Sequence, residues 1–155
     1  MKAAANPWTM SSATLALAGM IIAGIGLYFI ALRPPLLPED VRYMNLSAAE
    51  MEAFGPRLAM WLTQVFRVLG GYALATGVLL IALALTAFRT RHPVALAGAL
   101  VGGASSIGLM SVVNFTISSD FRWALFVSAL VWALSLALYG LESRASTAVA
   151  GNGNR

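Results

Sequence analysis

Four long apolar stretches, each ended by charged residues or prolines, constrain this chain more than any other feature of its sequence. They cover about residues 13–32, 68–88, 94–117 and 123–141, and none of them contains a charged residue. The hydrocarbon core of a bilayer is about 30 Å thick, and a helix that rises about 1.5 Å per residue crosses it in about 20 apolar residues. The sequence therefore predicts an all-α fold, an integral membrane bundle of four transmembrane helices.

The composition agrees with a membrane protein and excludes several other classes. Hydrophobic residues make up 59% of the chain and charged residues 10%, whereas soluble domains carry about 45–50% and about 25%. Because the chain has no cysteine, disulfides, thiolate metal sites and dithiol redox relays are excluded. Its cations lie at span ends and in loops without interleaved aromatic residues, which favours contact with the lipid bilayer over contact with nucleic acid.

The chain divides into one membrane domain and a short tail. We assign residues 1–144 to the four-helix transmembrane domain. Residues 145–155 are mostly small and polar, and we predict a disordered C-terminal tail there because they cannot bury enough apolar surface to fold. The first apolar run is longer than the roughly 7–15 residues of a signal-peptide core, so we expect a retained helix rather than a cleaved signal.

Residues 33–57 form the only long loop, and this loop holds four of the six acidic residues. Ser47 and Glu50 have the spacing of a capping box, in which the two side chains satisfy free N–H groups at a helix start. The pattern predicts a short helix over 47–54 that lies along the membrane surface and is ended by Gly55-Pro56. Nothing then interrupts a helix over 57–88, and a helix of that length spans about 48 Å, so we expect it to project beyond the bilayer.

Small residues recur at helical spacing within the spans, and such stripes let neighbouring transmembrane helices approach closely. The third span has two adjacent lines of glycine and serine, and we therefore predict that it is the central helix of the bundle. The stripes of the first three spans are Ala16, Gly19, Ala23 and Gly26; Gly70, Ala73, Gly77 and Ala84; and Gly98, Gly102 and Ser105 with Ala99, Gly103 and Ser106.

The polar residues nearest to membrane depth gather at the end of the bundle that carries the long loop. Five of them form our candidate ligand-binding site: Gln64, Arg67, Asn114, Asp120 and Arg122. In one interpretation Arg67 binds an anionic ligand or lipid head group. In the other, which we favour, Arg67 pairs with Asp120, or with Glu39 or Asp40, and fixes the loop across the mouth of the bundle, because arginine at a helix end commonly snorkels or pairs.

We predict no catalytic residue, no metal site and no cofactor. His92, the only histidine, lies in a short turn next to a proline, and we interpret it as a polar surface residue whose nearest plausible acid is Glu142. Glu50 and Glu52 are two residues apart and so do not share a helix face. The glycines of the third span match neither phosphate-binding nor dinucleotide-binding motifs. We therefore expect a protein that is not an enzyme.

Two short runs carry a resemblance to known proteins: Leu37-Pro-Glu-Asp40, and Arg67-Val-Leu-Gly-Gly-Tyr-Ala-Leu-Ala-Thr-Gly77 at the start of the second span. With these runs the chain resembles small uncharacterised bacterial four-helix integral membrane proteins, in a layout loosely similar to that of the DoxX family. The resemblance concerns the layout and assigns no functional residue.

The predicted function is that of an accessory or interaction subunit, whose small-residue faces and loop-side surface engage lipid, a partner membrane protein or a second copy of itself. The alternative is a binding or transport protein for a small anionic or lipid-like ligand at the outer end of the bundle. We expect a multi-pass protein of the bacterial inner membrane with both termini cytoplasmic. Cations divide evenly between the two sides, but Arg89 and Arg91 share a very short loop, which favours a cytoplasmic location for that loop.

Overall fold

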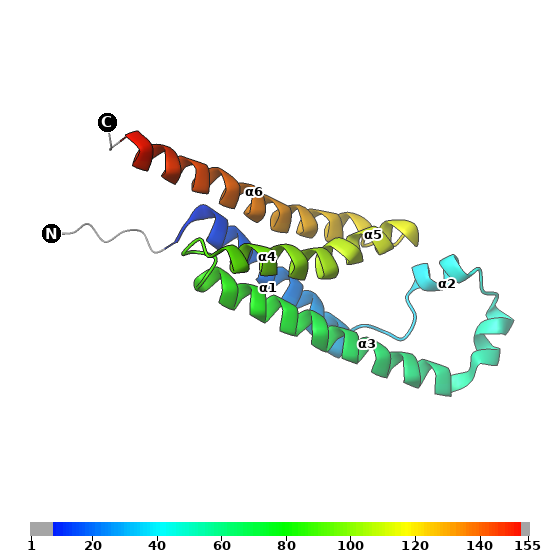
Figure 1. The fold of residues 1–155 in the computed structure, drawn as a ribbon. Helices are drawn as coiled ribbons and strands as arrows, with labels where there is room; N and C mark the ends of the chain where they lie inside the picture. Colours follow the sequence, from blue (N-terminus) through cyan, green and yellow to red (C-terminus); the bar gives the residue numbers. More distant parts are fainter. Residues whose placement is uncertain (1–7, 153–155) are drawn as a thin grey trace.

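The computed structural model describes residues 8–152, and it folds this part of the chain into helices joined by turns, without any β-strand (Figure 1). The side chains of Ala48, Phe54 and residues 146–152 lie outside the description. The elements are α1 (Met10–Ala31), α2 (Pro38–Met44), α3 (Ala48–Leu85), α4 (Pro93–Gly103), the π-helical segment η1 (Ala104–Gly108), α5 (Leu109–Thr116) and α6 (Arg122–Asn152).

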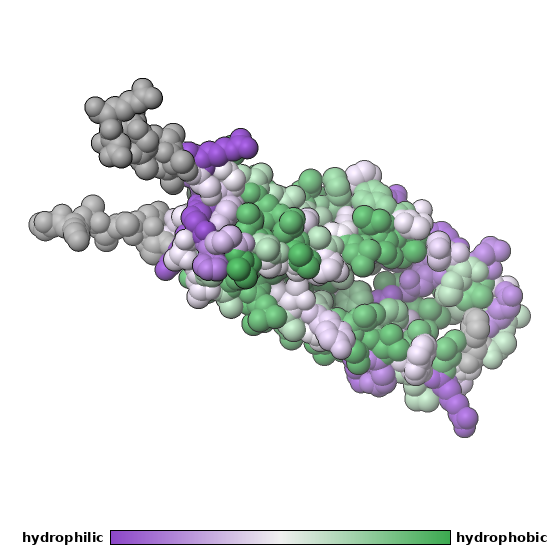
Figure 2. All heavy atoms as spheres, viewed as in Figure 1, coloured by the Kyte–Doolittle hydropathy of each residue, from purple (hydrophilic) through white to green (hydrophobic). Residues whose placement is uncertain are grey.

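Four helices are long and apolar enough to cross a membrane, which confirms the all-helical fold and the number of helices of that length. They cover Met10–Ala31, Gly55–Leu85, Pro93–Thr116 and Arg122–Ala145. The start of α1 and the end of α6 lie at the same end of the bundle (Figure 1), as expected for four helices that run alternately up and down. Hydrophobic residues form a belt over the middle of the molecule, and hydrophilic residues gather at its two ends on the face shown (Figure 2).

Helices α1 and α3 pack closely through the glycines that the sequence predicted for this purpose. A Cβ added at Gly26 would lie 2.4 Å from the backbone nitrogen of Leu74, and one at Gly77 would lie 2.5 Å from the carbonyl oxygen of Gly19. Side chains larger than hydrogen do not fit at such distances, so the backbones of the two helices are nearly in contact. Interhelical packing by small residues is the main source of association where lipid provides no hydrophobic drive.

The prediction that the third span is the central helix is wrong. Helix α1 packs against both α3 and α6. In its most apolar stretch 33% of the residues are buried, against 22% in the span formed by α4, η1 and α5. The reason lies in what the glycines meet. Gly98 and Gly102 face only the side-chain tips of Leu83 and Leu80, at 3.6 and 3.8 Å from an added Cβ, so they do not bring another backbone close.

The third span is interrupted by a π-helical turn, η1, which the sequence analysis did not predict. The hydroxyl groups of Ser105 and Ser106 donate to the carbonyl oxygens of Val101 and Gly102, at 2.7 and 2.5 Å, and such bonds compete with regular helical ones. On α6, Trp132 donates from Nε1 to the carbonyl oxygen of Ala99 at 2.9 Å. Its indole occupies the space that a side chain at position 103 would need.

The predicted capping box at Ser47 is confirmed. The backbone N–H of Glu50 donates to Ser47 Oγ at 3.3 Å, and the backbone N–H of Ser47 donates to Glu50 Oε2 at 2.8 Å. The short helix ends at Gly55, whose φ of 66° breaks α3 before Pro56 begins the long segment. Its location along the membrane surface remains a prediction.

Two helix ends differ from those predicted, and one helix was not predicted. Helix α3 ends at Leu85 rather than at position 88, because Phe88 turns inward and packs on Tyr139 with ring centres 4.6 Å apart. Helix α2 was not predicted, although Pro38 lies in its first turn and Asp40 accepts from the backbone N–H of Leu37 at 2.9 Å. Helix α6 continues to Asn152, beyond residue 145 where the predicted tail begins. Lys2 and residues 153–155 lie outside the described residues.

Candidate ligand pocket

The loop end of the bundle contains a cavity of about 610 Å³ between α1, α5 and α6. Phe66 of α3 lines one side, and residues of the segment from Arg33 to Asp40, including the start of α2, line the end beside the loop. The apolar side chains that line it come mainly from the spans: Ile21, Ile25, Tyr28, Phe29, Met110, Val113, Ile117, Phe121, Ala124 and Leu125. The cavity is thus mainly apolar along the spans, where Asn114 and Ser128 add polar groups, and charged at the loop.

Arg33 is the cation of this cavity. Helix α1 ends at Ala31 before Pro34-Pro35, and the Arg33 side chain, only 6% exposed, pairs with Asp40 at 2.9 Å between Nη2 and Oδ2. Its guanidinium carbon lies 3.3 Å from the ring centre of Phe66 and 5.3 Å from that of Phe29. The Nε atom is buried and has no hydrogen-bond partner among the described residues. One strong donor in the wall is therefore unused.

Glu39 places a second carboxylate in the wall. This residue is 2% exposed, and its Oε1 accepts from the hydroxyl of Ser119, itself fully buried, at 3.0 Å. Burial of a carboxylate is costly unless hydrogen bonds compensate for the lost water. Glu39 thus ties α2 to the link between α5 and α6. An exposed pair between Arg42 and Asp120, 3.2 Å apart, adds a second tie over the same link.

Only one of the five predicted site residues lines the cavity. Asn114 does so and donates from Nδ2 to the carbonyl oxygen of Met110 at 2.8 Å. Gln64 and Arg67 are exposed on α3, Asp120 is exposed and pairs with Arg42, and Arg122 donates to the carbonyl oxygen of Ser119 at 3.2 Å.

The expected pairing of Arg67 with Asp120, Glu39 or Asp40 is wrong. None of the ion pairs among the described residues includes Arg67. Successive residues of an α-helix point about 100° apart, and Phe66 faces the cavity, so its neighbour Arg67 is directed away from it. Arg33 takes the role expected of Arg67, and a local signal for it existed, because Phe29 precedes Arg33 by about one helical turn.

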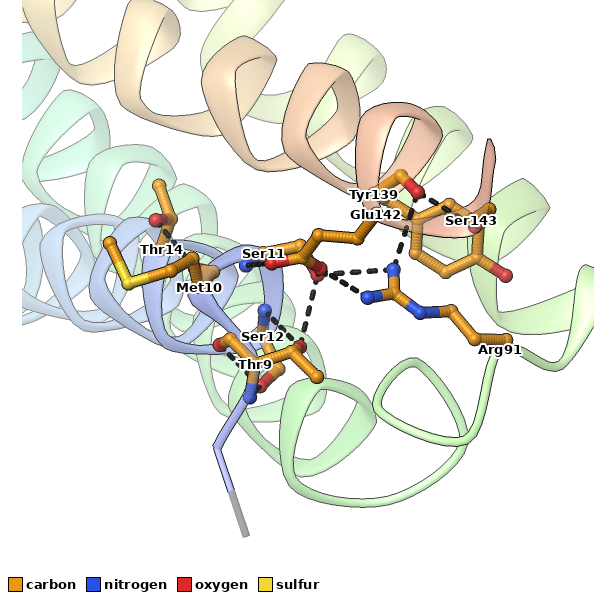
Figure 3. Close-up of polar contacts among 9 residues, drawn as sticks. All are labelled: Thr9, Met10, Ser11, Ser12, Thr14, Arg91, Tyr139, Glu142 and Ser143. Atoms are coloured by element: carbon orange, nitrogen blue, oxygen red, sulfur yellow. Dashed lines mark hydrogen bonds and ion pairs between the residues drawn. The ribbon is translucent and has the colours of Figure 1, made fainter. Parts of the chain in front are cut away.

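A second polar cluster joins three elements at the opposite end of the bundle (Figure 3). Glu142 of α6 and Arg91 of the turn between α3 and α4 form a short ion pair. Ser11 donates to the same carboxylate from its hydroxyl at 2.6 Å and from its backbone N–H at 3.2 Å. Arg91, not His92, is therefore the partner of Glu142, while His92 accepts from the backbone N–H of Val94 at 3.3 Å.

The described residues contain no group of three or more histidine or acidic side chains that could hold a metal ion. Comparisons with family models, curated proteins and solved structures find no match to this chain. The resemblance to DoxX-like proteins therefore remains a prediction.

Proposed function

We propose that this chain is a non-enzymatic integral membrane protein that binds a lipid-like molecule in the cavity between α1, α5 and α6. The observation that carries the proposal is the cavity itself. Its volume of about 610 Å³ falls within the range of about 300–1,000 Å³ that is usual for small-molecule sites. Its long apolar wall and its polar outer end match a molecule with a hydrophobic tail and a polar head.

The charged groups of the cavity favour binding over catalysis. Asp40 is engaged by Arg33, and Glu39 by Ser119, so each carboxylate is held in place by a neighbour. Both acids lie at the end of the cavity beside the loop. The arrangement is that of a head-group site above a tail site.

The other predicted role, an accessory subunit that engages a partner through small-residue faces, has less support. Two of the small-residue faces assigned to that role, those of α1 and α3, are in contact with each other inside the chain: Gly19 and Gly26 with Gly70 and Gly77. Those faces are therefore occupied before any partner approaches.

Filling the cavity tests the proposal. Gly24 lines it, and a Cβ added there meets nothing within 4 Å, so the side chain of Gly24→Phe begins in open space at the cavity wall. Gly71 is equally open but does not line the cavity, and Gly71→Phe is the matched control. We expect lipid-like molecules to be detected by native mass spectrometry with the wild type and with Gly71→Phe, and to be lost with Gly24→Phe. Equal occupancy in all three proteins would overturn the proposal.

We further propose that the protein lies in a bacterial inner membrane with both termini in the cytoplasm and the cavity at the outer side. The support is the pair Arg89 and Arg91 in the short turn at the terminal end, since cations in short loops favour the cytoplasm. A reporter fused at Arg155 tests this orientation. Alkaline phosphatase activity there, without fluorescence from a cytoplasm-dependent fluorescent protein at the same site, would contradict it.

A further inference from the structure

The charged side chains that line the cavity are unequal in number. One cation, Arg33, faces two carboxylates, Glu39 and Asp40, so the formal charge of the lining is negative by one unit. Arg42 and Arg122 do not line the cavity: Arg42 is paired with Asp120, and Arg122 bonds the backbone of Ser119. An anionic head group would therefore add a negative charge beside a carboxylate that has no cation of its own.

The hydrogen-bonding capacity left in the lining points the same way. Asp40 uses Oδ2 for both Arg33 and the backbone of Leu37, and Glu39 uses Oε1 for Ser119. Among the described hydrogen bonds, none ends at Asp40 Oδ1 or Glu39 Oε2, and an ionised carboxylate only accepts. The Nδ2 of Asn114 donates one of its two hydrogens to Met110, and no described hydrogen bond ends at its oxygen, which is a further acceptor. The cavity thus offers several acceptors and needs a ligand that donates.

One buried donor also lacks a partner, which refines the ligand. Arg33 Nε is buried without a partner, and a buried donor that stays unpaired costs free energy. A ligand with an acceptor oxygen close to its donating group would satisfy it. The rings of Tyr28 and Phe121 also line the cavity, and aromatic rings attract cations.

From this charge balance and these free atoms we infer that the ligand is a cationic amphiphile, with an amine head next to a hydroxyl or ester oxygen and an apolar tail. The amine donates to Glu39 and Asp40 and neutralises the excess charge, while the oxygen accepts from Arg33. The inference rests on the proposed function and names the class of molecule that the same cavity binds.

Three probes with the same tail distinguish a cationic, a neutral and an anionic head group: dodecylamine, dodecanol and dodecanoate. They are offered to the full chain in nanodiscs of zwitterionic phospholipid. We expect dodecylamine to bind at least about tenfold more tightly than dodecanoate, because a hydrogen bond to a charged group contributes about 1.5–3 kcal/mol and about 1.4 kcal/mol corresponds to a factor of ten. Dodecanol should bind with intermediate affinity. Tighter binding of dodecanoate than of dodecylamine would overturn the inference.

Two matched substitutions test whether the preference for the amine depends on the side chains that line the cavity. Glu39→Gln keeps an oxygen for Ser119 and removes the charge, and we expect it to weaken dodecylamine binding about tenfold while leaving dodecanol binding unchanged. Asp120→Asn removes an exposed charge outside the cavity and should change neither. Equal loss of amine binding in both variants would show that general surface charge, not the cavity, selects the head, and would also overturn the inference.

The Gly24→Phe variant distinguishes failure of this inference from failure of the proposed function. If Gly24→Phe abolishes binding of all three probes but the wild type does not prefer the amine, the cavity binds amphiphiles and only the head-group inference fails. If none of the probes binds in a manner sensitive to Gly24→Phe, both the inference and the proposed function are wrong.

Discussion

The guanidinium carbon of Arg33 lies 3.3 Å from the ring centre of Phe66, so this side chain, just beyond the end of α1, lies over a ring of α3. The same guanidinium pairs with Asp40 of α2. One side chain therefore joins the end of a span, the middle of its neighbour and the loop helix above them. A planar guanidinium can stack on a ring and pair with a carboxylate at the same time, which a lysine ammonium cannot do with the same geometry.

The ion pair between Arg33 and Asp40 is expected to show strong coupling. Asp40→Leu leaves a charge in a side chain that is only 6% exposed, and loss of one partner of a buried pair costs about 3–5 kcal/mol. The double variant Arg33→Met, Asp40→Leu should recover most of that free energy of unfolding. Unfolding in mixed micelles titrated with a denaturing detergent measures both values, and a double variant as unstable as the sum of the two single variants would contradict the prediction.

The contact between α1 and α3 predicts opposite outcomes for two glycines of the same helix. Gly77→Ala forces a Cβ to within 2.5 Å of the backbone of Ala23, and overpacking of this kind costs about 1–3 kcal/mol. Gly71→Ala meets nothing within 4 Å and should not lower the free energy of unfolding. Equal stability of the two variants in the same detergent titration would show that the helices are not packed as described.

The features of the fold that the sequence predicted are the local ones. Span length, the capping box of Ser47 and Glu50, and the glycines of α1 depend on residues close together in the chain. The features that it missed depend on distant partners. Trp132, which occupies the space beside Gly103 just before the π-helical turn, lies on another helix. The pairing of Arg33 rather than Arg67 depends on where α2 places Asp40, which no helical pattern within a span records.

The docking of α2 is expected to depend on the buried contact more than on the exposed one. Ser119→Ala removes the donor to Glu39, a residue only 2% exposed, and an unsatisfied buried acceptor costs about 1–3 kcal/mol. Arg42→Ala removes a pair whose side chains are 53% and 63% exposed, and such pairs contribute about 0–1 kcal/mol. Hydrogen exchange of the α2 amides should therefore accelerate far more in Ser119→Ala. The reverse order would contradict the assignment.

The capping box gives a pH dependence outside the spans. Hydrogen bonds from the Ser47 side chain and backbone lower the pKa of Glu50 below its ordinary value. Because the pKa in the folded state is the lower one, the cap stabilises the short helix above the ordinary pKa of glutamate, and this stabilisation is lost as the pH falls through the lowered pKa. Titration of Glu50 by NMR should show the lowered pKa, and Ser47→Ala should return it towards the ordinary value. An unchanged pKa in that variant would rule out the Ser47 hydroxyl as its cause.

The cluster of Ser11, Arg91 and Glu142 (Figure 3) should couple the two ends of the chain energetically. Helix α1 has no acidic residue in its own first turn, and Glu142 of α6 supplies the negative charge that a helix N-terminus favours. A double-mutant cycle of Ser11→Ala and Glu142→Ala should therefore give a coupling energy of about 1–3 kcal/mol, since residues in one hydrogen-bond network do not behave additively. Arg144 is exposed and forms none of the ion pairs among the described residues, so a cycle of Ser11→Ala with Arg144→Ala is the control and should give a value near zero. Coupling of the same size in both cycles would show that Glu142 acts through general helix stability rather than through its contacts with α1.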